Sequence, residues 1–149
     1  MDERSAAVSK DVISFTVSNA LAEVPRAAAQ VEAFCRERNF PAPIVYKFGL
    51  ALDETLTNVI SYAFADGKPH AIEIRLETRD GYLSALMSDD GAPFDPLSQP
   101  EPDVHAPLEQ RKIGGLGIHL VRKLMDKAEY QRRDGRNILT FGIRTDSKK

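Results

Sequence analysis

Apolar residues recur at two periods along the first half of the chain, and each period predicts a different element. Residues 13–17 alternate between apolar and polar side chains, which predicts a strand. Residues 25–39 show helical spacing and begin with Pro25, which suits the first turn of a helix. The strongest pattern covers residues 44–64, where apolar side chains recur every three or four positions. We therefore expect one strand and then two helices, after a flexible terminus at residues 1–10.

The second half of the chain is dominated by alternating patterns joined by short turns. Asp80-Gly81 and Asp134-Gly135 separate pairs of such patterns, and Asp-Gly is typical of a two-residue hairpin turn. A helix is expected at about residues 116–126, before the second hairpin. Strands are expected at residues 71–78, 82–88, 128–133 and 137–144.

This order of elements predicts an α+β fold. We expect a two-layer α/β sandwich, in which a mostly antiparallel, mixed sheet carries helices on one face. The 149 residues are expected to form a single domain, 1–149. Residues 92–113 are rich in proline and long for a connection within a domain, and such loops are usually functional lids or disordered.

Composition and charge exclude several kinds of function. The 20 basic and 22 acidic residues leave a net charge of -2, so direct nucleic-acid binding has no electrostatic support. The single cysteine, Cys35, excludes an intrachain disulfide. The polar N-terminus is not a signal peptide and no apolar run reaches the length of a membrane span, so we expect a cytoplasmic protein without membrane contact. His70, His105 and His119 show no metal-ligand spacing and are expected to be structural or solvated.

The first segment with candidate chemistry lies inside the predicted helix 44–64. Glu54 and Asn58 are four residues apart, so they share one helix face, which should border a cleft or water. Asn58 offers an amide oxygen that suits Mg²⁺, and Glu54 could orient or deprotonate an attacking hydroxyl or water. The alternative interpretation is an ordinary solvated helix face.

The second segment directly follows the predicted strand 82–88. Asp89 continues the side of that strand expected to be buried, and a buried carboxylate needs a hydrogen-bond donor such as the adenine amino group. Gly91 lets the backbone turn sharply and approach a flat ligand closely. The alternative is a common Asp-Asp-Gly turn at the end of a strand.

The third segment, Gly114-Gly115-Leu116-Gly117, precedes the predicted helix 116–126. Free backbone amides at a helix N-terminus bind phosphate, although the spacing lacks the Lys-Ser/Thr of a P-loop. Arg111 and Lys112, just upstream, could reach terminal phosphates if the loop closes. The alternatives are a flexible connection and unremarkable surface charges.

In their order along the chain, these segments resemble the sequence boxes of the histidine-kinase-like ATPases of the Bergerat fold. Residues 51–58 resemble the N box, residues 89–95 the G1 box and residues 114–126 the G2 box. Within that superfamily the chain looks most like the stand-alone anti-sigma-factor serine/threonine kinases of bacteria. The likeness covers roughly residues 12–145.

The resemblance implies ATP and Mg²⁺ as cofactors. Asn58 would hold Mg²⁺, Glu54 would be the candidate base, and Asp89 would bind the adenine amino group in a pocket shaped by Gly91. Asn137 stands where members often place a polar residue near adenine.

On the phosphate side, the resemblance makes residues 92–113 an ATP lid. Gly114-Gly115-Leu116-Gly117 would meet the phosphates, with Arg111 and Lys112 available as cationic partners.

The implied reaction moves the ATP γ-phosphate to a Ser or Thr on a small antagonist protein of the STAS fold. The second implied partner is an RNA polymerase sigma factor, and the implied assembly is a homodimer. Two alternatives stay open. One is a non-catalytic binding module that sequesters a sigma factor or another regulator in a nucleotide-dependent way. The other is an ATP-hydrolysing module of the chaperone or topoisomerase type.

Overall fold

Strands β1 to β5 form one antiparallel sheet in the computed structural model, which describes residues 11–98 and 121–146. The strand order is β1-β2-β3-β5-β4, and all four pairings within this part of the chain are antiparallel. The described sheet therefore contains no parallel pair, although the sequence had suggested a mixed sheet. The strands are β1 (Val12–Ser18), β2 (Ala71–Arg79), β3 (Tyr82–Asp89), β4 (Lys127–Arg133) and β5 (Arg136–Arg144).

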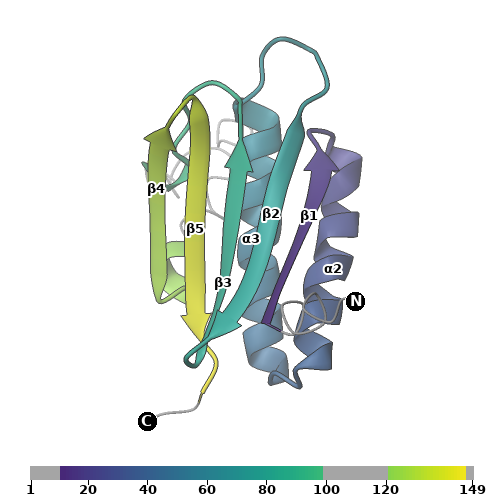
Figure 1. The fold of residues 1–149 in the computed structure, drawn as a ribbon, viewed down its shortest axis with the longest axis vertical. Coiled ribbons are helices and arrows are strands. Elements are labelled where there is room, and N and C mark those ends of the chain that lie inside the picture. Colours follow the sequence, from purple (N-terminus) through teal and green to yellow (C-terminus); the bar gives the residue numbers. More distant parts are fainter. Residues whose placement is uncertain (1–10, 99–120, 147–149) are drawn as a thin grey trace, which may run out of the picture.

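Helices α2 (Val24–Glu37) and α3 (Ala42–Tyr62) cover one face of the sheet, which confirms the predicted α+β sandwich (Figure 1). A short 3-10 turn, η1 (Leu21–Glu23), leads into α2, and Pro25 lies in the first turn of that helix as expected. A second 3-10 turn, η2 (Pro96–Ser98), follows β3. Residues 121–124 are helical, within the helix predicted at 116–126.

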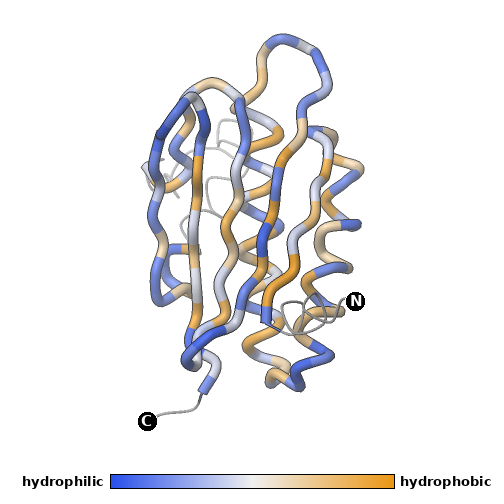
Figure 2. The backbone as a smooth tube through the Cα atoms, in the orientation of Figure 1, coloured by the Kyte–Doolittle hydropathy of each residue, from blue (hydrophilic) through white to orange (hydrophobic). Residues whose placement is uncertain are grey.

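The hydrophobic core lies between the two layers. Alternate residues of β2 and β3 are buried, as the period-two pattern predicted. Figure 2 shows hydrophobic and hydrophilic positions along the strands of the sheet. Phe48 of α3 meets Phe141 of β5 with their ring centroids 5.4 Å apart. Burying each such large side chain contributes about 1.5–3 kcal/mol, so this interface supplies most of the stabilisation of the fold.

Two tight turns fix the register of the sheet. Asp80 and Gly81 have φ angles of 55° and 80°, and Asp134 and Gly135 have 53° and 76°. Two consecutive positive φ values are typical of type I′ turns, whose twist matches that of the flanking strands. With the register set, Asp89 lies opposite Asn137 of β5 on one side and Ile72 of β2 on the other.

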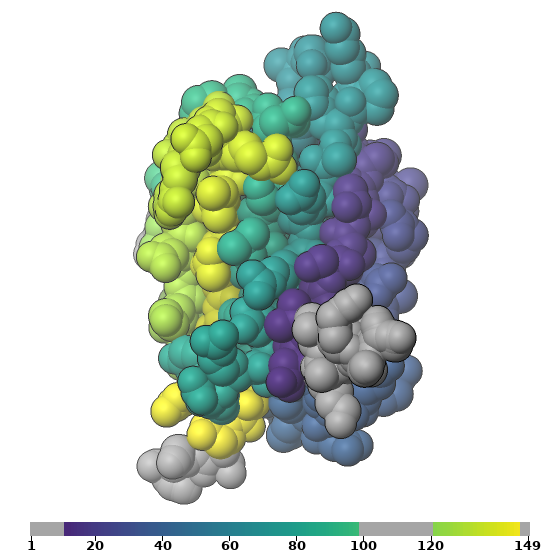
Figure 3. Space-filling view, viewed as in Figure 1, coloured from purple at the N-terminus to yellow at the C-terminus, as the bar shows by residue number. Residues whose placement is uncertain are grey.

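The opposite face of the sheet, which is turned toward the viewer in Figure 3, carries many polar and charged side chains. It holds a shallow depression of about 630 Å³, which is lined by side chains that include Arg75, Tyr82 and Arg144. Among the described residues, no helix combines the length and the apolar character that crossing a bilayer requires.

Candidate functional site

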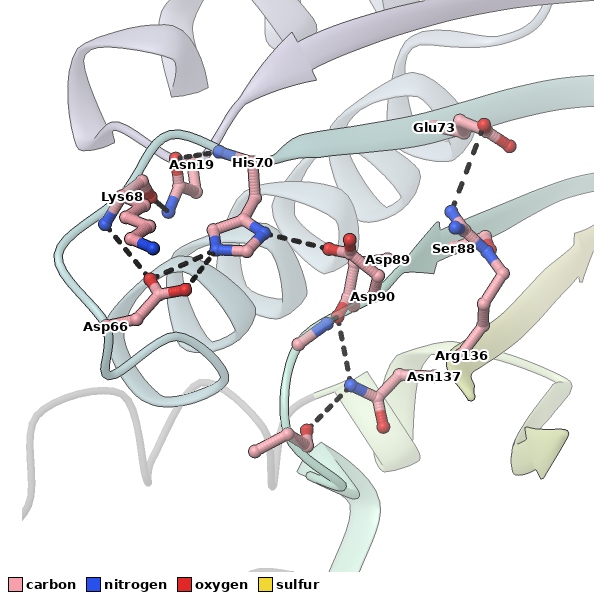
Figure 4. Close-up of polar contacts among 12 residues, drawn as sticks. Asn19, Asp66, Lys68, His70, Glu73, Ser88, Asp89, Asp90, Arg136 and Asn137 are labelled. Atoms are coloured by element: carbon pink, nitrogen blue, oxygen red, sulfur yellow. Dashed lines mark hydrogen bonds and ion pairs between the residues drawn. The ribbon is translucent and has the colours of Figure 1, made fainter. Parts of the chain in front are cut away.

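The carboxylate of Asp89 is the most deeply buried charged group of the site, with 1% of the residue exposed. Its Oδ1 accepts a hydrogen bond from the backbone N–H of Gly91 at 2.7 Å and another from Asn137 Nδ2 at 2.9 Å (Figure 4). The second oxygen, Oδ2, accepts neither of these bonds. The carboxylate is therefore held in one orientation through a single oxygen.

Asn137 connects this carboxylate to the turn that follows β3. Its Nδ2 also donates to the carbonyl oxygen of Ala92 at 2.9 Å. Its Oδ1 accepts from the backbone N–H of Phe94 at 3.0 Å and from the Tyr130 hydroxyl at 2.5 Å. Because the amide is buried and satisfied at both ends, Asn137 fixes residues 91–94 against the sheet.

Gly91 is required by a close approach between backbones. A Cβ at this position would lie 2.5 Å from the carbonyl oxygen of Ala63, at the end of α3. The same carbonyl accepts a hydrogen bond from Ala92 N at 2.8 Å. Arg132 Nη1, from β4, donates to the Gly91 carbonyl oxygen at 2.8 Å. The turn is thus clamped between α3 and β4, and steric space accounts for the glycine.

Asn58 lies in the buried part of α3, with 2% of the residue exposed. Ala51 and Thr55 on the same face are also buried, so this part of the helix is not an ordinary solvated face, and the expectation that it borders a cleft or water stays a prediction. Helical spacing defines which residues share a face but not what covers that face. Asn58 Nδ2 donates to the Glu54 carbonyl oxygen at 2.7 Å, so the amide oxygen points away from that part of the helix backbone.

The helix face that carries Asn58 reaches the turn after β3. Tyr62 lies one turn of α3 beyond Asn58, about 6 Å along the helix axis. Its ring contacts the ring of Phe94, with centroids 5.7 Å apart. Asn58 and Asp89 therefore belong to the same end of the molecule, and Glu54, partly buried, lies one further turn back along α3.

The remaining predicted site residues are outside the described part of the chain. These are Arg111, Lys112, Gly114, Gly115, Leu116 and Gly117, together with most of the predicted lid. Their positions relative to Asp89 remain predictions.

A cluster that the sequence did not reveal lies beside the same turn. His70 Nδ1 is 3.0 Å from Asp90 Oδ1, and His70 Nε2 is 2.8 Å from Asp66 Oδ2. The hydrogen bond with Asp66 raises the pKa of His70, and Asp90 raises it further. The backbone N–H of Lys68 lowers the pKa of Asp66, and His70 adds to that effect. The only sequence signal was the second carboxylate of the Asp-Asp-Gly segment.

Neither this cluster nor any other in the described part of the chain groups three His, Cys, Asp or Glu side chains so that they could hold a metal ion. A second hollow, of about 250 Å³, lies between α2 and α3, where Gly49 and Asp53 line it. This hollow and the depression on the outer face of the sheet both exclude Asp89 and Asn58 from their lining.

Comparison with known proteins supplies a family match. A model described as a histidine kinase-like ATPase domain matches residues 17–143. The chain is 37% identical over 100 residues to the serine/threonine-protein kinase BtrW of Bordetella bronchiseptica, across 67% of this chain and 70% of BtrW. It is 30% identical over 91 residues to the serine-protein kinase RsbW of Bacillus subtilis, across 58% of this chain and 56% of RsbW.

A solved structure shares the fold. The crystal structure of the RsbU and RsbW domains of Rv1364c from Mycobacterium tuberculosis matches with a TM-score of 0.63 and 14% sequence identity. The match covers 89% of this chain and 31% of that one. The chain thus spans little more than half the length of RsbW and about a third of the Mycobacterium chain.

Proposed function

The chain belongs to the family of histidine kinase-like ATPase domains, and on that premise we propose that it is an ATP-dependent serine/threonine protein kinase. The proposed reaction transfers the γ-phosphate of ATP to a Ser or Thr of a STAS-domain antagonist in the cytoplasm. A sigma factor is the proposed second partner, and the proposed assembly is a homodimer. The names of BtrW and RsbW support the kinase activity.

The observation that carries the proposal is the orientation of the buried Asp89 carboxylate. Burying a carboxylate costs several kcal/mol unless donors compensate it. The described bonds from Gly91 and Asn137 both end on Oδ1. Oδ2 is the proposed acceptor for the exocyclic amino group of adenine. Gly91 lets the turn pack closely against the Ala63 carbonyl oxygen, which keeps the carboxylate in place for that contact.

The amide of Asn58 fits a role in metal binding. Its Nδ2 is occupied by the Glu54 carbonyl oxygen, which leaves the amide oxygen as the ligand atom. Mg²⁺ prefers oxygen ligands and keeps several of its waters, so one protein ligand is enough beside phosphate oxygens. When bound, Mg²⁺ would neutralise negative charge on the phosphates.

Glu54 is the proposed catalytic residue. It lies on α3 four residues before Asn58, so the carboxylate and the metal-binding amide project from neighbouring turns of one helix. Phosphoryl transfer depends mainly on positioning and charge neutralisation, and a carboxylate can align the acceptor hydroxyl and accept its proton. Arg111, Lys112 and Gly114-Gly115-Leu116-Gly117 are proposed to hold the phosphates.

Two substitutions test the proposal, one through ATP affinity and the other through phosphate transfer. Asp89→Asn should weaken ATP binding at least about tenfold, because the charged acceptor is lost. Glu54→Ala should keep ATP affinity within about twofold but slow transfer by about 100-fold or more. Calorimetric titration measures the affinity, and γ-labelled ATP with a candidate STAS antagonist measures the transfer.

Matched controls separate these effects from general damage. Asp134→Asn changes the same residue type in an exposed turn, and Glu32→Ala removes an exposed glutamate from α2. Both should retain binding and transfer. ATP affinity that is unchanged by Asp89→Asn would contradict the adenine contact. Full binding without any transfer by the wild type would favour the alternative of a nucleotide-dependent binding module.

A further inference from the structure

We propose that His70, with a proton on each ring nitrogen, is a positioning residue that fastens the turn after β3 for nucleotide binding. The proposal rests on the proposed function only for its ligand, ATP. The contacts that carry it lie entirely within the protein.

The geometry around the imidazole ring requires two donors. Nδ1 lies 3.0 Å from Asp90 Oδ1, and Nε2 lies 2.8 Å from Asp66 Oδ2 (Figure 4). Ionised carboxylates only accept hydrogen bonds, and a neutral imidazole has only one N–H. Only the imidazolium can donate to both carboxylates, so the arrangement selects the charged ring.

Contacts other than those with the two carboxylates also fix the position of the His70 ring. The backbone N–H of His70 donates to Asn19 Oδ1 at 2.9 Å, and its carbonyl oxygen accepts from Asn19 N at 3.1 Å. The ring of Phe64 stacks on the imidazole with centroids 4.8 Å apart. Only 19% of the His70 side chain is exposed. Its ring is therefore restrained in the orientation that faces the two carboxylates.

Asp90 transmits this contact to the nucleotide site. It directly follows Asp89, the last residue of β3, and directly precedes Gly91. Asn137 holds the turn from β5, and the Ala63 carbonyl oxygen holds it from the end of α3. His70 supplies a further attachment from the residue that precedes β2, the strand whose Ile72 pairs with Asp89. Loss of the ring charge would leave one N–H for two carboxylates and would weaken this attachment of the turn.

The charges around His70 set the direction of the pH effect. Asp66 and Lys68 come from the segment after α3, Asp90 comes from the turn with Asp89 beside it, and the groups from Asn19 and Phe64 are neutral. The carboxylates raise the pKa of His70 above its usual 6.5, against an opposing effect of burial. The attachment therefore has both charge-assisted hydrogen bonds below about pH 6.5, and it weakens as the pH rises through the raised pKa.

The first test needs no nucleotide. Titration of the His70 ring by NMR, assigned with His70→Gln, should give a pKa above 6.5 that falls in both Asp66→Asn and Asp90→Asn. A pKa at or below 6.5, or one that Asp90→Asn does not change, would overturn the proposed contact.

The second test measures ATP affinity by calorimetry at pH 6 and pH 9. His70→Gln should weaken ATP binding up to about tenfold at pH 6, which is the size expected for one charge-assisted hydrogen bond. Its affinity should also change less with pH than that of the wild type. Asp90→Asn should behave similarly, and it provides a second variant if His70→Gln folds poorly. Lys68→Gln is the matched control, because Lys68 takes part through its backbone groups.

The outcomes separate the two proposals. Identical pH profiles for the wild type and His70→Gln, with ATP bound by both, would overturn the role of His70 alone. Failure of the wild type to bind ATP at either pH would overturn the proposed function and, with it, the role of His70. The NMR titration would still decide whether His70 carries two protons.

Discussion

Single polar side chains determine the shape of this site. The amide of Asn137 joins Asp89 on β3 to Ala92 and Phe94 in the following turn. Removing one partner of a buried hydrogen bond leaves the other unsatisfied, at a cost of about 1–3 kcal/mol. Asn137 therefore supports both the stability of the turn and the orientation of the proposed adenine acceptor.

In contrast to the hydrogen-bonded amide of Asn137, Asp53 has a buried carboxylate oxygen that no hydrogen bond from a described residue compensates. Its Oδ1 is buried and has no hydrogen-bond donor in the described part of the chain. Burial raises the pKa of Asp53, and the neighbouring charge of Glu54 raises it further. The folded protein thus binds this proton more tightly than the unfolded chain does. Asp53 therefore costs stability as the pH rises above 3.8, the usual value.

We predict that Asp53→Asn stabilises the protein at pH 7 relative to pH 4. The neutral amide removes the buried charge, and the gain should be a few tenths to about 1 kcal/mol. Urea unfolding at both pH values measures it, with Asp134→Asn in an exposed turn as the control. A stability difference between variant and wild type that is the same at both pH values would contradict this explanation.

At the scale of elements, the end of α3 and the turn after β3 act as one unit. The Ala63 carbonyl oxygen bonds to Ala92 N, and it would lie 2.5 Å from a Cβ at Gly91. Gly49, in the middle of α3, is the opposite case, because a Cβ there would meet nothing within 4 Å.

We predict that Gly91→Ala and Gly49→Ala change stability in opposite directions. Gly91→Ala should cost about 1–3 kcal/mol through overpacking against a backbone oxygen, and it should weaken ATP binding by moving the turn. Gly49→Ala should gain about 0.5–1 kcal/mol, because alanine favours the helix. Urea unfolding of both variants measures this, and equal effects would show that the turn can move away from Ala63 at little cost.

Periodicity predicted the elements better than it predicted their surroundings. The helix expected at residues 44–64 is α3 at Ala42–Tyr62, and the strand expected at 82–88 is β3 at Tyr82–Asp89. These patterns are local, and the apolar side of each strand was correct. The burial of Asn58 was not predictable in this way, because it depends on what packs over the helix.

At the scale of the whole molecule, α2 and the sheet share one continuous core. Cys35 lies in that core with 0% exposed, and burial raises the pKa of its thiol to about 11, against a smaller opposing effect of the Arg38 charge. Thiolate, the reactive form, is then about a thousandth of the total at pH 8.

We predict that Cys35 reacts only when the core opens. Labelling with a disulfide reagent at pH 8 should be at least about 100-fold slower in the native protein than in denaturing urea. The ratio should fall in Gly91→Ala if that substitution destabilises the whole domain. Rapid labelling under native conditions would show that α2 separates locally from the sheet.

The contacts that sequence reasoning missed join distant parts of the chain. His70 meets Asp90, 20 residues later, and Asn137 meets Asp89 across 48 residues. Such pairs depend on strand order and register, which no local pattern encodes. The motif residues could be found from the sequence, whereas the groups that hold them in place required the assembled sheet.

The separation between Asp89 and Asn137 also bears on how the chain acquires its structure during synthesis. Pairing of β3 with β5 closes a long loop of chain. Such non-local contacts form slowly, because the chain loses conformational entropy on closing the loop before the contacts stabilise it. A nascent chain that ends before residue 137 contains the Asp89 carboxylate but lacks the Asn137 amide that orients it. Under the proposed function, ATP can therefore favour the folded state only after the ribosome has released both hairpins.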